Sequence, residues 1–92
     1  MSEADFQKAV AFVTSSENKS LKVDTKSKLA LYGLYKQATV GPNTTPKPGF
    51  TKITDGYKWK AWSLLGQMSP SDARSKYVEL VRQIASSNSS KL

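Results

Sequence analysis

Residues 69–84 of the chain read Ser-Pro-Ser-Asp-Ala-Arg-Ser-Lys-Tyr-Val-Glu-Leu-Val-Arg-Gln-Ile. Their apolar side chains recur at the spacing i, i+4, i+7, i+8, i+11 of one helical face: Ala73, Tyr77, Leu80, Val81 and Ile84. Ser69 stands where an N-cap is favoured, and Pro70 follows in the first turn. The stretch therefore predicts an amphipathic helix over about 69–85, followed by a tail at 86–92 that should fray.

Working towards the N-terminus, three more helices are predicted. The apolar positions Phe6, Val10 and Val13 repeat at i, i+4, i+7 and indicate a helix over about 3–15. A second helix over about 24–40 is predicted to begin at Asp24 or Thr25 as the cap and to end at Gly41. The third helix, over about 55–65, should be capped by Asp55 and closed by a left-handed Gly66.

The segment at 41–54 should form a long loop, because it contains Pro42, Pro46, Pro48, Gly41 and Gly49. Loops of this length in small proteins are usually functional or mobile. No alternation typical of strands competes with the helical patterns. The sequence therefore predicts an all-α, four-helix fold in a single domain over 1–92.

The residue inventory restricts the chemistry. The chain has neither cysteine nor histidine, which excludes disulfides, thiolate metal sites, His-dependent triads and Cys nucleophiles. Seven carboxylates are scattered along the chain without a tight pair in sequence. The sequence therefore predicts a protein that is not an enzyme and that holds no metal and no cofactor.

The charge points to an anionic partner. The formal net charge is +7, and nine of the fourteen basic residues lie within 19–60, where the only acids are Asp24 and Asp55. Nucleic acid, an anionic membrane surface and a phosphorylated small molecule all fit this charge. The acidic start, 1–5, and the absence of a long apolar run favour a cytoplasmic location.

The second predicted helix carries the most specific pattern. At about 100° per residue, Ala30, Leu31, Leu34 and Ala38 share the arc expected to face the core. The opposite side presents Tyr32, Tyr35, Lys36 and Thr39. Tyr32 and Lys36 are i, i+4 neighbours and could reach one anionic group together. At this point it is an equally good interpretation that these residues are simply two half-buried tyrosines and a solvated lysine with no ligand.

Aromatic residues and lysines are also interleaved in the third predicted helix. Trp59 and Trp62 are expected in the core, and of Lys58 and Lys60 at most one should join Lys36, since the two project in different directions. Tyr77 falls on an apolar stripe, so periodicity alone favours a core tyrosine over a ligand contact. Such clusters can stack nucleic-acid bases, but this compact one suits a single phosphorylated, ring-bearing ligand better.

Several of these segments together resemble the acyl-CoA-binding protein family: Leu-Tyr-Gly-Leu-Tyr-Lys-Gln-Ala-Thr-Val-Gly at 31–41, Lys-Pro-Gly at 47–49, Lys-Trp-Lys-Ala-Trp at 58–62, and Ala73 with Tyr77. The resemblance runs from Phe6 to about Ile84. It implies a four-helix bundle of up-down-down-up topology with a bowl-shaped site. It also implies a monomer that binds medium- to long-chain fatty acyl-CoA and acts as an intracellular carrier and buffer.

The resemblance also implies roles for individual residues. Tyr32, Lys36 and Lys58 would hold the 3′-phosphate of CoA, and Tyr35 would pack beside the adenine. Tyr77 would complete the site, and Gly33 and Leu34 belong to the same ligand-binding stretch, although Leu34 lies on the predicted core side. Thr14 occupies a position where many members have a basic residue and is expected to make a weaker contact.

The expected partners are therefore long-chain acyl-CoA and, transiently, membranes or acyl-CoA-using enzymes, with no role for nucleic acid. Two other functions fit the sequence less well. One is a protein-docking adaptor with the same fold and vestigial CoA binding, and the other is an RNA- or membrane-binding module that uses the basic surface. The preferred acyl length is not specified by the sequence.

Overall fold

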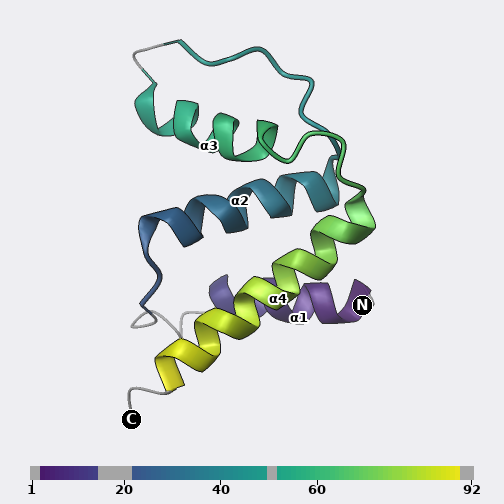
Figure 1. Cartoon of the computed structure of the whole chain (residues 1–92), viewed down its shortest axis with the longest axis vertical. Coiled ribbons are helices and arrows are strands. Elements are labelled where there is room, and N and C mark those ends of the chain that lie inside the picture. Colours follow the sequence, from purple (N-terminus) through teal and green to yellow (C-terminus); the bar gives the residue numbers. More distant parts are fainter. Residues whose placement is uncertain (1–2, 15–21, 50–51, 90–92) are drawn as a thin grey trace.

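The computed structural model describes residues 3–14, 22–49 and 52–89, and it contains four helices (Figure 1). They are α1 (Glu3–Thr14), α2 (Thr25–Thr39), α3 (Ile53–Ser63) and α4 (Pro70–Ser89). No strand occurs within these described ranges. The all-α, four-helix prediction is therefore confirmed.

The helices follow the expected up-down-down-up order. Figure 1 shows α2 and α3 side by side and running in the same direction, while α1 and α4 run the opposite way. The connection between α2 and α3 travels back along the length of α3, which is why two consecutive helices can be parallel. Helix α2 is central, since it contacts both α3 and α4, whereas α1 packs on α4.

The core forms where α1, α2 and α4 meet, and it contains the predicted apolar faces. Ten buried side chains make up this cluster: Phe6, Ala9, Leu31, Leu34, Ala38, Ala73, Tyr77, Val78, Val81 and Ile84. On α4 the predicted stripe is buried except for Leu80, which is only partly covered. On α2 the predicted arc is buried except for Ala30, which is half-buried.

Two of the three predicted N-caps are present. The Asp24 carboxylate accepts from Ser27 N at 2.9 Å at the start of α2, and hydrogen bonds from the Ser27 side chain and from this backbone N–H lower the pKa of Asp24. Ser69 Oγ likewise accepts from Asp72 N at 3.1 Å at the start of α4. Gly66 has a φ of 58°, the left-handed conformation expected after α3.

The predicted start of α3 was wrong. The helix begins at Ile53 rather than at 55, and Asp55 lies within its first turn instead of capping it. Lys52 precedes the helix and makes no side-chain cap. A carboxylate in the first turn still stabilises a helix through the partial positive charge of the N-terminus. Asp55 therefore correctly indicated that a helix begins here, although the helix starts two residues earlier than predicted.

The predicted fraying from residue 86 was also wrong, because α4 continues to Ser89. The Asn88 amide donates to Ile84 O at 2.9 Å and to Lys22 O at 3.1 Å, and its oxygen accepts from Lys22 N at 2.9 Å. These bonds tie the last turn of α4 to the segment that leads into α2. Residues 90–92 of the predicted tail, and residue 15 of the first predicted helix, lie outside the described part of the chain.

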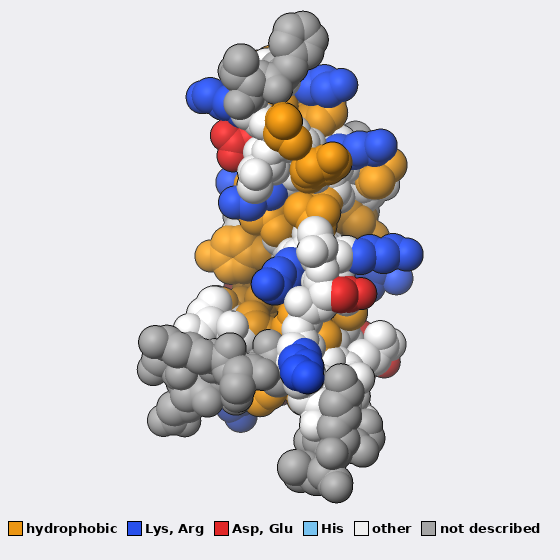
Figure 2. All heavy atoms as spheres, turned by 90° about the vertical axis from the view of Figure 1, so that its left-hand side faces the viewer, with side chains coloured by type: hydrophobic (Ala, Val, Ile, Leu, Met, Phe, Trp, Pro, Cys, Tyr) orange, Lys and Arg blue, Asp and Glu red, His pale blue; other side chains and the backbone are white. Residues whose placement is uncertain are grey.

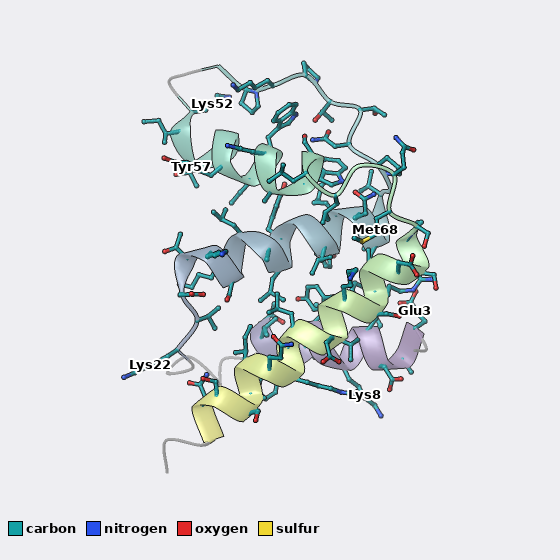
Figure 3. The ribbon with its side chains drawn as sticks, in the orientation of Figure 1. Glu3, Lys8, Lys22, Lys52, Tyr57 and Met68 are labelled. Atoms are coloured by element: carbon teal, nitrogen blue, oxygen red, sulfur yellow. The ribbon has the colours of Figure 1, made fainter. Side chains whose placement is uncertain are left out.

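Gln37 is a fully buried polar residue on the core side of α2. Its Nε2 donates to Gly66 O at 3.0 Å and to Met68 O at 2.8 Å, both in the connection between α3 and α4. Figure 3 shows that Met68 lies close to the end of α2. The side chain therefore fastens the α3–α4 connection to the central helix.

Replacing Gln37 by alanine should lower the free energy of unfolding by about 2–4 kcal/mol. The change removes two hydrogen bonds, leaves two backbone carbonyls without these donors and opens a cavity. Urea denaturation followed by circular dichroism measures this. The matched control is Gln7→Ala on the exposed side of α1, which should change stability by less than about 0.5 kcal/mol. Equal losses in the two variants would contradict the assigned role of Gln37.

Candidate functional site

Helix α3, the middle of α2 and the connection between these helices line an open hollow of about 240 Å³. It brings together three residues that the sequence singled out, namely Tyr32, Lys36 and Lys58. The other lining residues are Thr45, Pro48, Asp55, Trp59 and Trp62. Lys60, the other lysine considered for this cluster, lines a separate groove instead.

The two lysines of the hollow are positioned over aromatic rings. Lys58 Nζ lies 5.5 Å from the centroid of the Tyr32 ring, and Lys36 Nζ lies 4.9 Å from the centroid of the Trp62 ring. The contacts hold both ammonium groups at the hollow by cation–π attraction while leaving N–H donors for an anion. Asp55 is the one carboxylate among the lining residues, and it opposes two cations. The arrangement suits a phosphorylated ligand.

The connection between α2 and α3 is fastened to α3 and forms the outer wall of the hollow. Trp59 Nε1 donates to Thr45 O at 3.0 Å, and Trp62 Nε1 donates to Gly41 O at 2.8 Å. Asn43 Nδ2 also donates to Ser63 Oγ at 2.7 Å. These bonds explain how a segment rich in proline and glycine can contribute lining residues at defined positions.

The two tryptophans are site residues that the sequence analysis assigned to the core. Trp62 is buried, as expected, but it also faces the hollow, whereas Trp59 is only half-buried and its placement in the core was wrong. A signal for Trp62 was present in the sequence. It follows Lys58 by four residues, so both lie on the same helical face.

Gly33 sets the distance between the two helices that carry the site. A Cβ atom at this position would come within 2.8 Å of the backbone oxygen of Ala61 on α3. Gly33 is buried at this contact, and Leu34 is buried beside the groove that also includes Lys60. The structure therefore does not group Gly33 and Leu34 with Tyr32, Lys36 and Lys58, and their roles as ligand contacts remain predictions.

Tyr35 and Tyr77 belong to a second aromatic group, together with Phe6 of α1. The Tyr35 ring stacks on Phe6 with 6.1 Å between centroids, and Tyr77 meets Phe6 edge-on at 5.2 Å. Tyr35 keeps 41% of its surface exposed, whereas Tyr77 is buried, as its periodicity favoured. Phe6 was expected in the core and not beside a candidate ligand residue. The group offers one exposed ring supported from behind by two buried ones.

Residues 3–81 match the family model described as acyl CoA binding protein. The chain belongs to the acyl-CoA-binding protein family. It is 48% identical over 81 residues to the acyl-CoA-binding domain-containing protein 1 of Arabidopsis thaliana, an alignment that covers 86% of this chain and 24% of that protein. It is also 48% identical over 69 residues to the acyl-CoA-binding protein of Saccharomyces cerevisiae, covering 75% of this chain and 79% of the yeast protein.

The fold of the family is also found in solved structures. The crystal structure of the acyl-CoA-binding protein from Moniliophthora perniciosa matches with a TM-score of 0.85 and 38% identity, covering 91% of this chain and 80% of that one. Several other curated relatives are much longer, and this chain spans only 18% to 24% of their length. The family resemblance found in the sequence is thereby confirmed.

Thr14 lies at the end of α1 and does not line the hollow of this family member. Its side chain is exposed, and its hydroxyl donates to Val10 O at 2.8 Å within the helix. The weaker ligand contact predicted for Thr14 remains a prediction.

The described ranges contain no group of three or more His, Cys, Asp and Glu side chains placed to hold a metal ion. None of the helices in those ranges combines the length and the apolar composition that a membrane crossing requires.

The Tyr77 hydroxyl should ionise at a higher pH than an ordinary tyrosine. Burial, and to a smaller extent the neighbouring Tyr35, raises its pKa to about 12 from the ordinary value of 10.0. The unfolded chain loses this proton first, so the folded form is destabilised as pH rises through 10 to 12, by about 2–3 kcal/mol at the upper end. Below pH 10 the Tyr77 hydroxyl is protonated in both the folded and the unfolded chain, so its contribution to the free energy of unfolding does not change with pH.

This prediction is checked by comparing the stability of the natural chain and of Tyr77→Phe between pH 9 and about pH 12. The difference in free energy of unfolding between the natural chain and Tyr77→Phe should depend on pH only above pH 10, since the rest of the chain is the same in both. A constant difference across the range would contradict the raised pKa. Tyr57→Phe, at an exposed position, is the control.

Proposed function

We propose that this protein binds medium- to long-chain fatty acyl-CoA thioesters non-covalently and acts as an intracellular carrier and buffer for them. The observation that carries the proposal is the hollow in which Tyr32, Lys36 and Lys58 converge from two helices in a member of the acyl-CoA-binding protein family. The names of its relatives point to the same ligand class.

The three residues would hold the 3′-phosphate of the CoA ribose. A phosphate needs donors that carry charge, and two ammonium groups with a phenol hydroxyl provide them within one small hollow. The half-exposed ring of Tyr35 would pack beside the adenine, with the buried Phe6 and Tyr77 holding it in place. Gly33, Leu34 and Thr14 are kept as secondary candidates, the first two on the α2 stretch and the last with a weaker contact.

The acyl chain would supply much of the affinity. Removing a methylene from water contributes about 0.8 kcal/mol, so shielding about a dozen of them contributes roughly 10 kcal/mol before the cost of ordering the chain. A ligand that combines a phosphate with such a chain should therefore bind far more tightly than either fragment. This expectation defines the first experiment.

The proposal includes no reaction. The chain has no cysteine and no histidine, and acyl-CoA is the ligand rather than a cofactor of a chemical step. We further propose a monomeric, cytoplasmic protein in which 1–92 form one acyl-CoA-binding domain, with transient contacts to membranes or to acyl-CoA-using enzymes and no role in binding nucleic acid.

The test is calorimetric titration with palmitoyl-CoA, with free CoA and palmitate as separate ligands. Stoichiometric binding with a dissociation constant below about 1 µM, and weak binding of both fragments, supports the carrier function. Binding of palmitoyl-CoA that is no tighter than that of CoA would overturn it and favour a protein-docking adaptor. An RNA- or membrane-binding module would instead bind those anionic partners with an affinity that falls steeply with salt, whereas palmitoyl-CoA binding should lose much less.

A further inference from the structure

Thr45 is an exposed hydroxyl residue that lines the hollow and stands directly before Pro46. Both residues lie in the connection between α2 and α3, outside any helix, and Pro46 and Lys47 are exposed as well. A proline disfavours the helical conformation of the residue before it. A threonine or serine before proline, in an exposed segment without helix, is the pattern that proline-directed protein kinases modify. Thr45 therefore has the features of a phosphorylation site.

The chain has one other residue of this kind, because Ser69 precedes Pro70. Ser69 is the N-cap of α4, where its Oγ accepts from Asp72 N at 3.1 Å, and the helix begins at Pro70. Protein kinases bind their substrates as extended segments, whereas the residues after Ser69 are helical. Ser69 also does not line the hollow. Of the two positions, only Thr45 combines an exposed segment without helix with a place in the candidate site.

Two hydrogen bonds of the Thr45 backbone hold this residue beside the hollow. Its N–H donates to Asn43 Oδ1 at 2.9 Å, and its carbonyl oxygen accepts from Trp59 Nε1 at 3.0 Å. The hydroxyl makes a third bond, which it donates to the same Asn43 oxygen. Phosphorylation would remove only this third bond, because the ester oxygen has no proton to donate. The phosphate would therefore be attached to a residue whose backbone stays anchored at the hollow.

A phosphate on Thr45 would reverse the net charge of the hollow. The ionised side chains among its lining residues are Lys36, Lys58 and Asp55, with a net charge of +1. Phosphothreonine carries about −1.5 to −2 at pH 7 and supplies strong acceptor oxygens for the two ammonium groups. A sphere with the volume of the hollow is only about 8 Å across, close to one Debye length at physiological ionic strength. Salt would therefore screen the added charge only in part.

The surroundings of the hollow attract the same anion. Figure 2 looks at the face where α2 and α3 begin and shows that its charged side chains are mostly basic. The formal net charge of the whole chain is +7. A phosphate attached to the connection is therefore drawn towards the two helices rather than repelled from them.

We propose that Thr45 is a phosphorylation site through which a proline-directed protein kinase inhibits ligand binding in the hollow. The inference rests on the proposed function, because the added phosphate would compete with the 3′-phosphate of acyl-CoA for Lys36 and Lys58. The kinase transfers the γ-phosphoryl group of ATP. The bond between Thr45 Oγ and phosphorus forms, the bond from that phosphorus to the β–γ bridging oxygen breaks, ADP leaves, and the hydroxyl proton passes to the catalytic base of the kinase.

The first experiment tests whether the folded chain is a substrate. The purified chain is incubated with an active mitogen-activated protein kinase and ATP, and the modified position is identified by tandem mass spectrometry. We expect phosphate on Thr45 and none on the exposed Thr44, which does not precede proline. In Thr45→Ala, kinase treatment should leave the affinity for palmitoyl-CoA at its value before treatment. A folded chain that stays unmodified at Thr45 would overturn the proposal.

The second experiment measures palmitoyl-CoA binding by the chain with phosphothreonine incorporated at position 45 during translation. The dissociation constant should rise at least about tenfold relative to the unmodified chain. It should rise by a clearly smaller factor for palmitoyl-dephospho-CoA, which has no 3′-phosphate. Ser69→Asp is the matched control, because it adds a negative charge at the other position before proline and keeps a favoured N-cap. This variant should bind palmitoyl-CoA within about twofold of the natural chain.

A third readout requires no ligand. Pairing with an ammonium group lowers the second pKa of a phosphate, ordinarily about 6, and ³¹P NMR measures this pKa. The second pKa of phosphothreonine 45 should be lower in the otherwise natural chain than in Lys36→Met. If the phosphate changes neither palmitoyl-CoA binding nor shows this pKa difference, the proposal is overturned while the proposed function stands. Failure of the proposed function is seen separately, as the absence of palmitoyl-CoA binding by the unmodified chain.

Discussion

Palmitoyl-CoA should bind about 10- to 100-fold more weakly to Lys36→Met than to the natural chain. A hydrogen bond to a charged group contributes about 1.5–3 kcal/mol, and in the proposed site removal of the ammonium would leave the 3′-phosphate with one cation fewer in the hollow. Methionine keeps most of the apolar stem and removes the ammonium group that lies over the Trp62 ring, so the change removes charge rather than bulk. Calorimetric titration measures the difference.

The ligand itself supplies the sharpest control for this prediction. Palmitoyl-dephospho-CoA lacks the 3′-phosphate, so the natural chain and Lys36→Met should bind it with similar affinity. Lys60→Met, on α3 but outside the hollow, should bind palmitoyl-CoA like the natural chain. If Lys36→Met weakens both ligands equally, Lys36 contacts another part of the ligand, and the assignment of the phosphate to this hollow fails.

Gly33→Val should lower the free energy of unfolding by about 2–4 kcal/mol and also weaken palmitoyl-CoA binding. A Cβ atom at this position would lie 2.8 Å from Ala61 O and 3.2 Å from Trp62 N, and these neighbours are backbone atoms that cannot rotate away. The two helices would have to separate at their closest approach. Lys36 is on α2 and Lys58 is on α3, so moving the two helices apart would also change the distance between the two lysines in the hollow.

Gly56 offers a matched control for this effect. It is also in a helix, but a Cβ atom there would have no neighbour within 4 Å. Gly33→Ala should destabilise the fold, whereas Gly56→Ala should stabilise it by roughly 0.5–1 kcal/mol, the usual gain in helix propensity. Thermal or urea unfolding of the two alanine variants shows directly whether each change stabilises or destabilises the fold. Stabilisation by Gly33→Ala would show that the helices tolerate the extra atom.

The candidate site was partly predictable because some of its geometry is local. Tyr32 and Lys36 are one turn apart on a helix, so the sequence alone placed them side by side. The convergence of Lys58 from α3 was expected through the family resemblance, not through any local pattern. Tyr35, expected beside these residues on the outer side of α2, is instead grouped with Phe6 of α1 and Tyr77 of α4, whose rings lie next to its own.

The sequence by itself determined the number and type of the helices, their apolar faces and the caps at Asp24 and Ser69, since these depend on side chains within a few residues of one another. Only the tertiary structure decided where α4 ends, because Asn88 is bonded to Lys22, 66 positions away. It also decided the burial of Gln37 and the exposure of Ile53, Tyr57 and Leu64. Such features depend on which helices pack together, and the spacing of residues within one helix does not specify its neighbours.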